Sequence, residues 1–405
     1  MKLIRLSFLY FRSRPLHVAL SMLLLMLGLS LMVSLLSINE QMKARLSANA
    51  DGIGMVVSAK GSPLQAILCS VFQVEFPTGN IDLAEATAVS GHPLVKEAIP
   101  MAIGDSYQGY RLVGTNHAYP AHYNAELDEG KLWTQVMEVT LGSRVAEKLG
   151  ITLGDELISD HGFAAGVEAH DEHAFTVVGI LEPTYTVLDD LILTSVESFW
   201  VSHDQIHMPD NAPAVTTGLP KGDSLQITSL LIKYASPLAA VQLPRLININ
   251  TNMMAASPAY ESARLFERLG VGVDILQAFA VLVLVVAALS IFLSLFNALK
   301  ERQYDLAMMR AMGATRGKVF LLVILESLWI TLLGALLGLL LGHSLVGGMA
   351  YTNEAAERLG LSGTYWLGST EVLLAALSIT LGVVSAIYPA WKAYRMDISD
   401  TLAES

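Results

Sequence analysis

Several motifs that would mark a catalytic chain are missing from this sequence of 405 residues. It lacks the G-x-x-x-x-G-K-[ST] phosphate-binding loop, because the nearest string, residues 313–318, is one residue short and has no Ser or Thr after the lysine. It also lacks the H-E-x-x-H motif of zinc proteases and the G-x-S-x-G turn of serine hydrolases. Any process driven by ATP would therefore need a separate ATPase subunit.

Cysteine and charge are also scarce. Cys69 is the single cysteine, so no intrachain disulfide can form, and the sequence assigns it no role. Charged residues make up 15% of the chain and are unevenly spread: residues 50–265 hold 25 acidic and 10 basic residues, a net charge of −15. This segment has the charge of a soluble acidic domain, and it argues against nucleic acid as a partner because phosphate binding requires Lys and Arg.

Four long apolar runs are present instead. They cover residues 16–38 and approximately residues 271–297, 319–346 and 370–391. Each is long enough to cross a ~30 Å hydrocarbon core as a helix, which takes about 20 residues. The first run is longer than the apolar region of about 7–15 residues in a cleaved signal peptide, so we interpret it as an uncleaved anchor.

The segment between the first two runs has mixed secondary-structure signals. Residues 174–181 are rich in β-branched residues and residues 225–234 alternate, so both predict strands, whereas Ser143–Leu149, closed by Gly150, predicts a helix. Strands and helices interleave without a regular βαβ rhythm, which favours an α+β domain. The sequence therefore predicts an α-helical membrane protein with four transmembrane helices and a large extracytoplasmic α+β domain between helices 1 and 2.

We expect three parts. Residues 1–50 would form the cytoplasmic N-terminus, the first span and the start of a stalk, residues 51–257 the α+β domain, and residues 258–405 a second stalk helix and the remaining spans. Basic residues collect in residues 1–15 and between the second and third spans, so the positive-inside rule predicts that both termini are cytoplasmic.

The basic loop between the second and third spans is not a plain charged loop. Tyr304, Leu306 and Met309 lie in it at near-helical spacing. We expect a short amphipathic helix over residues 303–312 that ends at Gly313, with Asp305 and Arg310 apart from a Leu306/Met309 apolar side. Such a helix can lie on the membrane or bind a soluble partner.

The same loop resembles a family signature. Residues 301–302, Asp305 and residues 310–315 are similar to the E-R-x-x-E…R-A-x-G-A-[ST] pattern of FtsX/MacB-type ABC-transporter permeases, with Asp305 where Glu is usual. Residues 141–157 and 175–182 resemble the MacB-like periplasmic core domain. The resemblance implies that this helix docks into a nucleotide-binding subunit. The residues it assigns to ATPase coupling are Glu301, Arg302, Tyr304, Asp305, Met308, Met309, Arg310, Ala311, Gly313 and Ala314.

The resemblance also implies a function. It indicates a non-catalytic permease subunit of the bacterial inner membrane, acting as a homodimer with two copies of an ABC ATPase. ATP and Mg would be held by the ATPase, and this chain would bind no cofactor. ATP hydrolysis would drive motion of the periplasmic domain (mechanotransmission), with the help of a periplasmic adaptor or substrate-binding protein. Membrane lipid would surround the spans.

The sequence is compatible with several kinds of cargo. Export of a periplasmic peptide or small molecule, extraction of lipoproteins and handling of a transition metal are all compatible with the sequence. So is an FtsX-like signalling permease that transports nothing and activates a cell-wall hydrolase. A membrane metallohydrolase built on the histidines of the middle segment is the enzymatic alternative.

Two features of the third span predict contacts within the membrane. Gly334, Gly338 and Gly342 recur every four residues, which permits close approach of another helix. Glu326 lies about two turns into this span, where an acid is costly, so it should face protein or a cavity and pair with a basic residue of the loop.

Histidines are concentrated in the acidic segment. His203 and His207 are four residues apart, which on a helix would place both on one face. Imidazole and carboxylate groups suit zinc and similar ions, so a metal site is one interpretation, and a solvated polar loop with incidental histidines is the other. The candidate ligands are His161, His170, Asp171, His173, His203 and His207.

Overall fold

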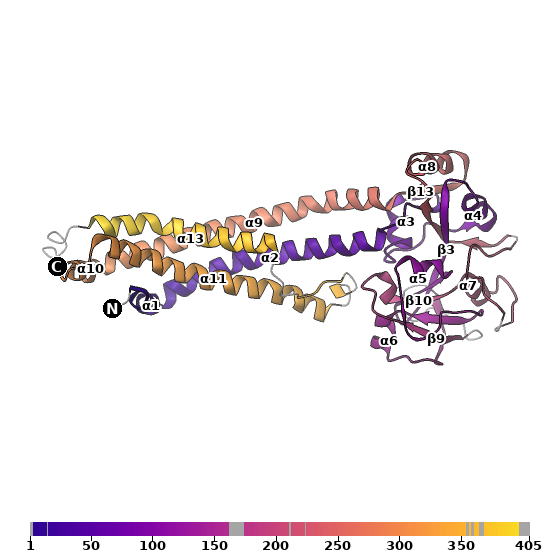
Figure 1. Cartoon of the computed structure of the whole chain (residues 1–405), viewed down its shortest axis with the longest axis horizontal. Coiled ribbons are helices and arrows are strands. Elements are labelled where there is room, and N and C mark those ends of the chain that lie inside the picture. The colour runs from indigo at the N-terminus through magenta and orange to yellow at the C-terminus, as the bar shows by residue number, and fades with distance from the viewer. Residues whose placement is uncertain are drawn as a thin grey trace. The chain divides into compact units, whose positions relative to one another are not determined.

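The computed structural model describes residues 3–13, 15–161, 174–209, 212–222, 224–353, 356–357, 360–363 and 368–396. The chain divides into two compact units (Figure 1). Met1–Met42 and Leu269–Ser405 form the first, which we call the membrane unit, and Lys43–Arg268 form the second, which we call the ectodomain. Two long helices, α2 (Pro15–Ala50) and α9 (Pro258–Glu301), contribute residues to both units.

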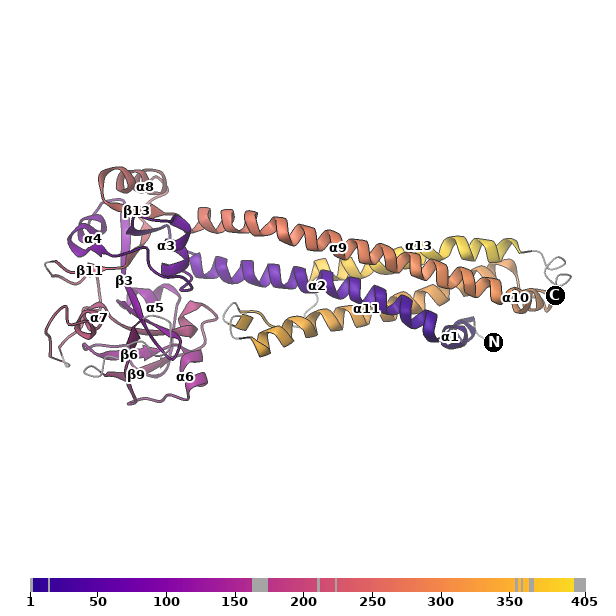
Figure 2. The same cartoon turned by 180° about the vertical axis from the view of Figure 1, so that it is seen from behind.

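The membrane unit is helical. Besides parts of α2 and α9, it contains α1 (Leu3–Ser13), α10 (Gln303–Ala311), α11 (Arg316–Thr352) and α13 (Ser369–Arg395). Of these helices, α2, α9, α11 and α13 are long and apolar enough to cross a membrane, in agreement with the four predicted spans. Within the unit they run side by side in both views (Figures 1 and 2).

Helix α11 packs closely against two neighbours. Towards α13, the hydroxyl of Ser327 donates to the Gly382 carbonyl at 2.8 Å. Towards α2, it presents the glycines at positions 334, 338 and 342. The absence of side chains at these positions lets the helix backbones approach, which is how helices associate in an apolar solvent.

The ectodomain is built on one large mixed sheet. Its strand order is β13-β1-β12-β3-β4-β10-β6-β9-β5, with β7 on β9 and β8 on β3, and β11 and β2 form a separate pair. Most pairs are antiparallel, but β4 with β10 and β6 with β9 are parallel. The strands are β1 (Met55–Ala59), β2 (Ile81–Asp82), β3 (Val95–Tyr107), β4 (Tyr110–Thr115), β5 (Leu127–Gly130), β6 (Glu138–Leu141), β7 (Glu156–Leu157), β8 (Asp160–His161), β9 (Phe175–Leu181), β10 (Leu191–Ser195), β11 (Gln226–Ile227), β12 (Ser229–Tyr234) and β13 (Met253–Ala256).

Short helices complete this α+β fold. They are α3 (Pro63–Ser70), α4 (Leu83–Ser90), α5 (Ala118–His122), α6 (Ser143–Leu149), α7 (Val196–Ser202) and α8 (Ala239–Asn250), with one 3₁₀ turn, Val187–Asp190. Helix α6 has the predicted bounds, and Gly150 ends it with φ +65°, a conformation that favours glycine. The core contains the fully buried side chains of Trp133, Trp200, Tyr119 and Phe175.

Candidate functional site

The loop between α9 and α11 folds into a separate helix, α10. Arg302 interrupts the helical backbone with φ −107° and ψ 14° and serves as its N-cap. The carbonyl of Arg302 accepts the N–H of Leu306 at 3.0 Å. At the other end Gly313 has φ +100°, which ends the helix because few residues except glycine adopt this conformation. Helix α10 is thus a distinct element between two candidate spans, as the sequence predicts.

One side of α10 packs against the membrane unit. Leu306 and Ala307 are buried, and Met309 is half-buried. The side chain of Leu306 joins a cluster formed by residues of α9, α11 and α13, whose buried members are Leu299, Leu306, Val319, Leu322, Val323, Ala390 and Ala393. Movement of α10 must therefore displace these three helices or break this packing.

Arg310 belongs to the packed side. The prediction that Arg310 lies apart from the Leu306/Met309 side is wrong, whereas Asp305 is exposed as expected. Arg310 is half-buried, and its guanidinium donates to the carbonyl of Met396. The reason is geometric: Arg310 follows Leu306 by four residues, so the two share a face of the helix.

The opposite side of α10 carries exposed side chains that do not pack against the membrane unit. Tyr304, Met308 and Met312 are 48%, 39% and 75% exposed, and they follow one another at intervals of four residues. Asp305 and Ala311 are exposed beside them. We call Tyr304, Met308 and Met312 the outer face. Large apolar side chains at helical spacing are typical of a helix that binds a groove in a partner protein.

A buried ion pair lies beneath α10. Arg302 Nη1 is 3.4 Å from Glu326 Oε1, and only 11% and 9% of these two side chains are exposed. Arg302 Nη2 also donates to the Tyr10 carbonyl at 3.2 Å, and the guanidinium lies 4.3 Å from the centre of the Tyr10 ring. The structure thus agrees with the expected pairing of Glu326 with a basic residue of the loop, and Arg302 joins α1, α10 and α11.

The other signature residues are at the ends of α10. Glu301 is exposed at the end of α9, and Gly313 is exposed after α10. Ala314 is half-buried, and its N–H donates to the Met309 carbonyl at 3.0 Å. Ala314 therefore helps to close the turn into α11, whereas Gly313 is open to a partner.

The three glycines of α11 face α2. A Cβ atom added to Gly334, Gly338 or Gly342 would lie 2.8, 3.0 or 2.9 Å from the nearest side-chain atom of α2. The hydroxyl of Ser34 also donates to the Gly342 carbonyl at 3.1 Å. The side chains that the glycines meet recur every four residues as well: they are Leu25, Leu29 and Val33.

The proposed metal ligands are not gathered into one site in the part of the ectodomain that the structure describes. His170, Asp171 and His173 lie outside the described residues, and so does the side chain of His161. Helix α7 ends at Ser202, so His203 and His207 do not share a helix face. Within the described residues, no three His, Cys, Asp or Glu side chains come close enough to hold a metal ion.

His203 has a different partner. Its Nε2 is 3.3 Å from Oδ1 of the fully buried Asp105 side chain, and its Nδ1 is 2.8 Å from the Phe199 carbonyl. Burial lowers the pKa of His203, but the hydrogen bond and the charge of Asp105 outweigh it, so the pKa is raised above its ordinary value. This pair joins the end of α7 to β3.

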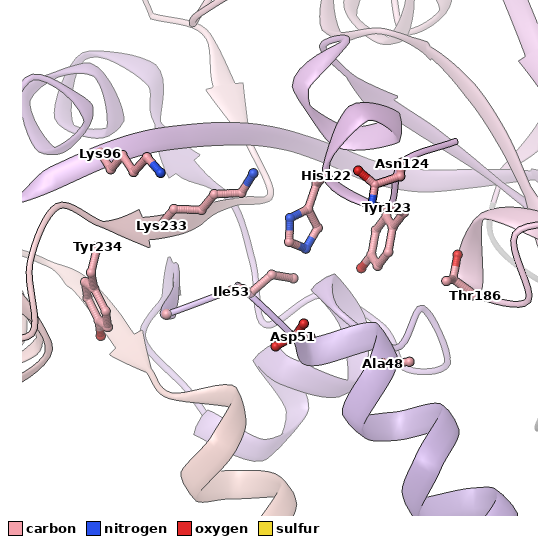
Figure 3. Close-up of a pocket in the computed structure, with 12 residues that line it drawn as sticks. Ala48, Asp51, Ile53, Lys96, His122, Tyr123, Asn124, Thr186, Lys233 and Tyr234 are labelled. Carbon is pink, nitrogen blue, oxygen red and sulfur yellow. The ribbon is translucent and has the colours of Figure 1, made fainter. Parts of the chain in front are cut away.

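The ectodomain also contains a pocket of about 770 Å³ that no sequence motif predicted. Figure 3 shows Lys96 and Lys233 reaching toward His122, with Asp51 across the space. Burial, with the charge of Lys233, lowers the pKa of His122. Lys233 is itself held by Glu97 at 2.7 Å. The volume is in the range of small-molecule sites, and groups of both signs line it.

Comparisons with known proteins match both halves of the chain. Residues 18–242 match the MacB-like periplasmic core domain, and residues 278–398 match the FtsX-like permease C-terminal domain. The lipoprotein-releasing system transmembrane protein LolE of Haemophilus influenzae is 25% identical over 201 residues, 44% of this chain and 46% of LolE. The match therefore spans about half the length of that relative.

Two solved structures resemble part of the chain. The periplasmic region of MacB from Actinobacillus actinomycetemcomitans has 13% identity and a TM-score of 0.34, covering 53% of this chain and 94% of that one. The extracellular domain of the noncanonic ABC-type transporter YknZ from Gram-positive bacteria has 14% identity and a TM-score of 0.31, covering 50% and 99%.

The two domain matches, together with four candidate spans, define a membrane permease with a periplasmic-type domain. The chain belongs to the FtsX/MacB-type family of ABC-transporter permeases.

Proposed function

We propose that this chain is the membrane subunit of an ABC transporter and that a separate ATPase subunit docks on the outer face of α10. The observation that carries the proposal is the division of α10 into a packed side with Leu306 and an uncovered apolar side with Met308. A groove in a soluble partner would cover Tyr304, Met308 and Met312. In a homodimer two such faces would engage the two ATPase copies, which would hold ATP and Mg.

The packing beneath α10 supports a mechanical role. Because Leu306 and Arg302 contact α9, α11 and α1, a displacement of α10 by the ATPase would move these helices with it. Helix α9 is continuous from Pro258 to Glu301 and contributes to both units. Motion at its end near α10 would therefore be passed along the helix toward the ectodomain, where it would move or release a periplasmic substrate.

The outer face gives a direct test. In the native membrane, tagged wild-type chain should retain an ABC ATPase through purification, whereas Met308→Asp and Tyr304→Asp should retain at least tenfold less. Burying an uncompensated carboxylate in an interface costs several kcal/mol, and 1.4 kcal/mol corresponds to tenfold in affinity. These variants test docking better than Arg310→Asp, which would also disturb the Met396 contact.

Asn353→Asp is the matched control, because it adds the same charge at an exposed position after the far end of α11. It should retain the ATPase like wild type. Equal retention of the ATPase by Met308→Asp and wild type would refute docking on the outer face.

A lipoprotein is the cargo that the comparisons favour, because the LolE match covers 44% of this chain. We propose that the ATPase-bound dimer releases lipid-modified proteins from the membrane. Spheroplasts that carry the wild-type chain should then release lipoproteins to an added soluble carrier only with ATP. Export of an unlipidated substrate instead would contradict the cargo assignment, whereas equal lipoprotein release from spheroplasts with the Met308→Asp variant would contradict docking on the outer face.

A further inference from the structure

A cluster of cationic and aromatic side chains joins the ends of α9 and α13. Lys300 Nζ and Lys392 Nζ lie 5.0 and 4.6 Å from the centre of the same Phe296 ring. The Arg395 guanidinium lies 4.1 Å from the centre of the Trp391 ring. Tyr388 connects the two halves, with ring centres 6.3 Å from Phe296 and 6.4 Å from Trp391. We call these six residues the basic–aromatic cluster.

The three cations of this cluster are available to an external anion. Across the described residues, no carboxylate lies within ion-pair distance of Lys300, Lys392 or Arg395. By contrast, Arg302 of the same unit is held by Glu326. Lys300 and Arg395 are exposed, as are the rings of Tyr388 (52%) and Trp391 (45%). Two cations over the Phe296 ring and one over the Trp391 ring therefore form a site that can bind an anion.

The helix faces that lead to the cluster are apolar. On α9, Leu289 and Leu293 are 57% and 55% exposed and precede Phe296 by seven and three residues, so all three share one face. On α13, Val384 is 54% exposed and precedes Tyr388 by four residues. Along each candidate span, exposed apolar side chains are followed by aromatic rings and then by cations. This order matches the acyl chains, the interfacial region and the phosphate of a phospholipid.

We propose that the basic–aromatic cluster binds the phosphate of an anionic phospholipid headgroup, with the acyl chains along the exposed apolar faces of α9 and α13. Lys300 and Lys392 would contact the phosphate from the two helices, and Arg395 would add a third donor. Tyr388 and Trp391 would hold the glycerol region, where aromatic side chains gather in membranes. Since α10 begins two residues after Glu301, a bound lipid would sit beside the ATPase-docking helix.

The test is lipid binding to the full-length chain. The detergent-purified chain is titrated with a short-chain phosphatidylglycerol, and the bound lipid is counted by native mass spectrometry. The variant Lys300→Gln/Lys392→Gln/Arg395→Gln should bind on the order of 100-fold more weakly, because each cation near an anionic headgroup contributes about fivefold. The charge-conserving variant Lys300→Arg/Lys392→Arg/Arg395→Lys should bind like wild type.

A second triple variant controls for net charge. Arg12→Gln/Arg316→Gln/Lys318→Gln removes three exposed cations elsewhere in the membrane unit and should leave binding of the first phosphatidylglycerol unchanged. Equal affinity for phosphatidylcholine, or equal weakening by both Gln triples, would overturn the proposal. Displacement of the lipid by millimolar inorganic phosphate would also overturn it, by showing that the site recognises free phosphate.

Discussion

Replacing Arg302 with alanine would remove the cation that lies 3.4 Å from the Glu326 carboxylate. At that separation two unit charges attract each other by about 5 kcal/mol at an effective dielectric constant of 20. Loss of one partner from a buried pair costs about 3–5 kcal/mol, because the remaining charge keeps its desolvation penalty. With side-chain exposures of 11% and 9%, we expect Arg302→Ala to fall in this range.

The double variant Arg302→Met/Glu326→Leu separates the charge from the packing. Exchanging a buried pair for apolar residues of similar size is often neutral, so we expect this variant to be more stable than Arg302→Ala. The assay is the midpoint of thermal unfolding of the detergent-solubilised chain. Using about 2–4 °C per kcal/mol, Arg302→Ala should lower it by roughly 6–20 °C.

An exposed cation provides the control, since Arg316→Ala should shift the midpoint by less than about 2 °C. If Arg302→Ala unfolds at the wild-type temperature, the pair does not stabilise the membrane unit. If the double variant is as unstable as the sum of Arg302→Ala and Glu326→Leu, the two side chains do not interact and the reasoning fails.

Three further predictions concern packing, pH and thiol reactivity. Gly338→Leu should destabilise the membrane unit by about 1–3 kcal/mol in the same assay, whereas Gly348→Leu, where a Cβ meets no atom within 4 Å, should be near neutral. Because the pKa of His203 is raised in the folded chain, its stabilisation is complete below its ordinary pKa near 6.5 and is lost as pH rises through the raised value. Hydrogen exchange around α7 should show this loss in wild type, and a persistent pH dependence in Asp105→Asn would contradict it. Burial raises the pKa of Cys69 to about 11, so a maleimide at pH 8 should react on the order of 100-fold more slowly than with an exposed thiol; equal rates would refute its burial.

Local sequence was enough to predict the four spans and α10 of the membrane unit, but it did not predict α1 as a separate helix. The four spans follow from run length and composition, and α10 follows from the spacing of Tyr304, Leu306 and Met309 with a glycine stop at position 313. The glycine repeat of α11 likewise indicated close packing, although not the partner helix. These features depend on residues within a few turns of each other, which is the range over which helical periodicity is readable.

The same local rules gave a wrong result at the C-terminal end of helix α7. The i, i+4 argument for His203 and His207 assumed a helix, but α7 ends at Ser202. Helix ends depend on caps and on tertiary packing, so they are harder to predict than helix centres. The pocket beside His122 was not predictable at all, because its lining comes from segments scattered between residues 48 and 234.

By itself, the sequence determined that this chain has four apolar spans, an acidic α+β domain and a helix with a family signature between two spans. Only the tertiary structure decided how those parts are used: that Arg310 is packed inward, that Met308 faces outward, that Arg302 is the partner of Glu326, and that Phe296 meets Tyr388. The physical reason is that periodicity gives a helix two sides, but which side is covered depends on helices that are distant in the chain.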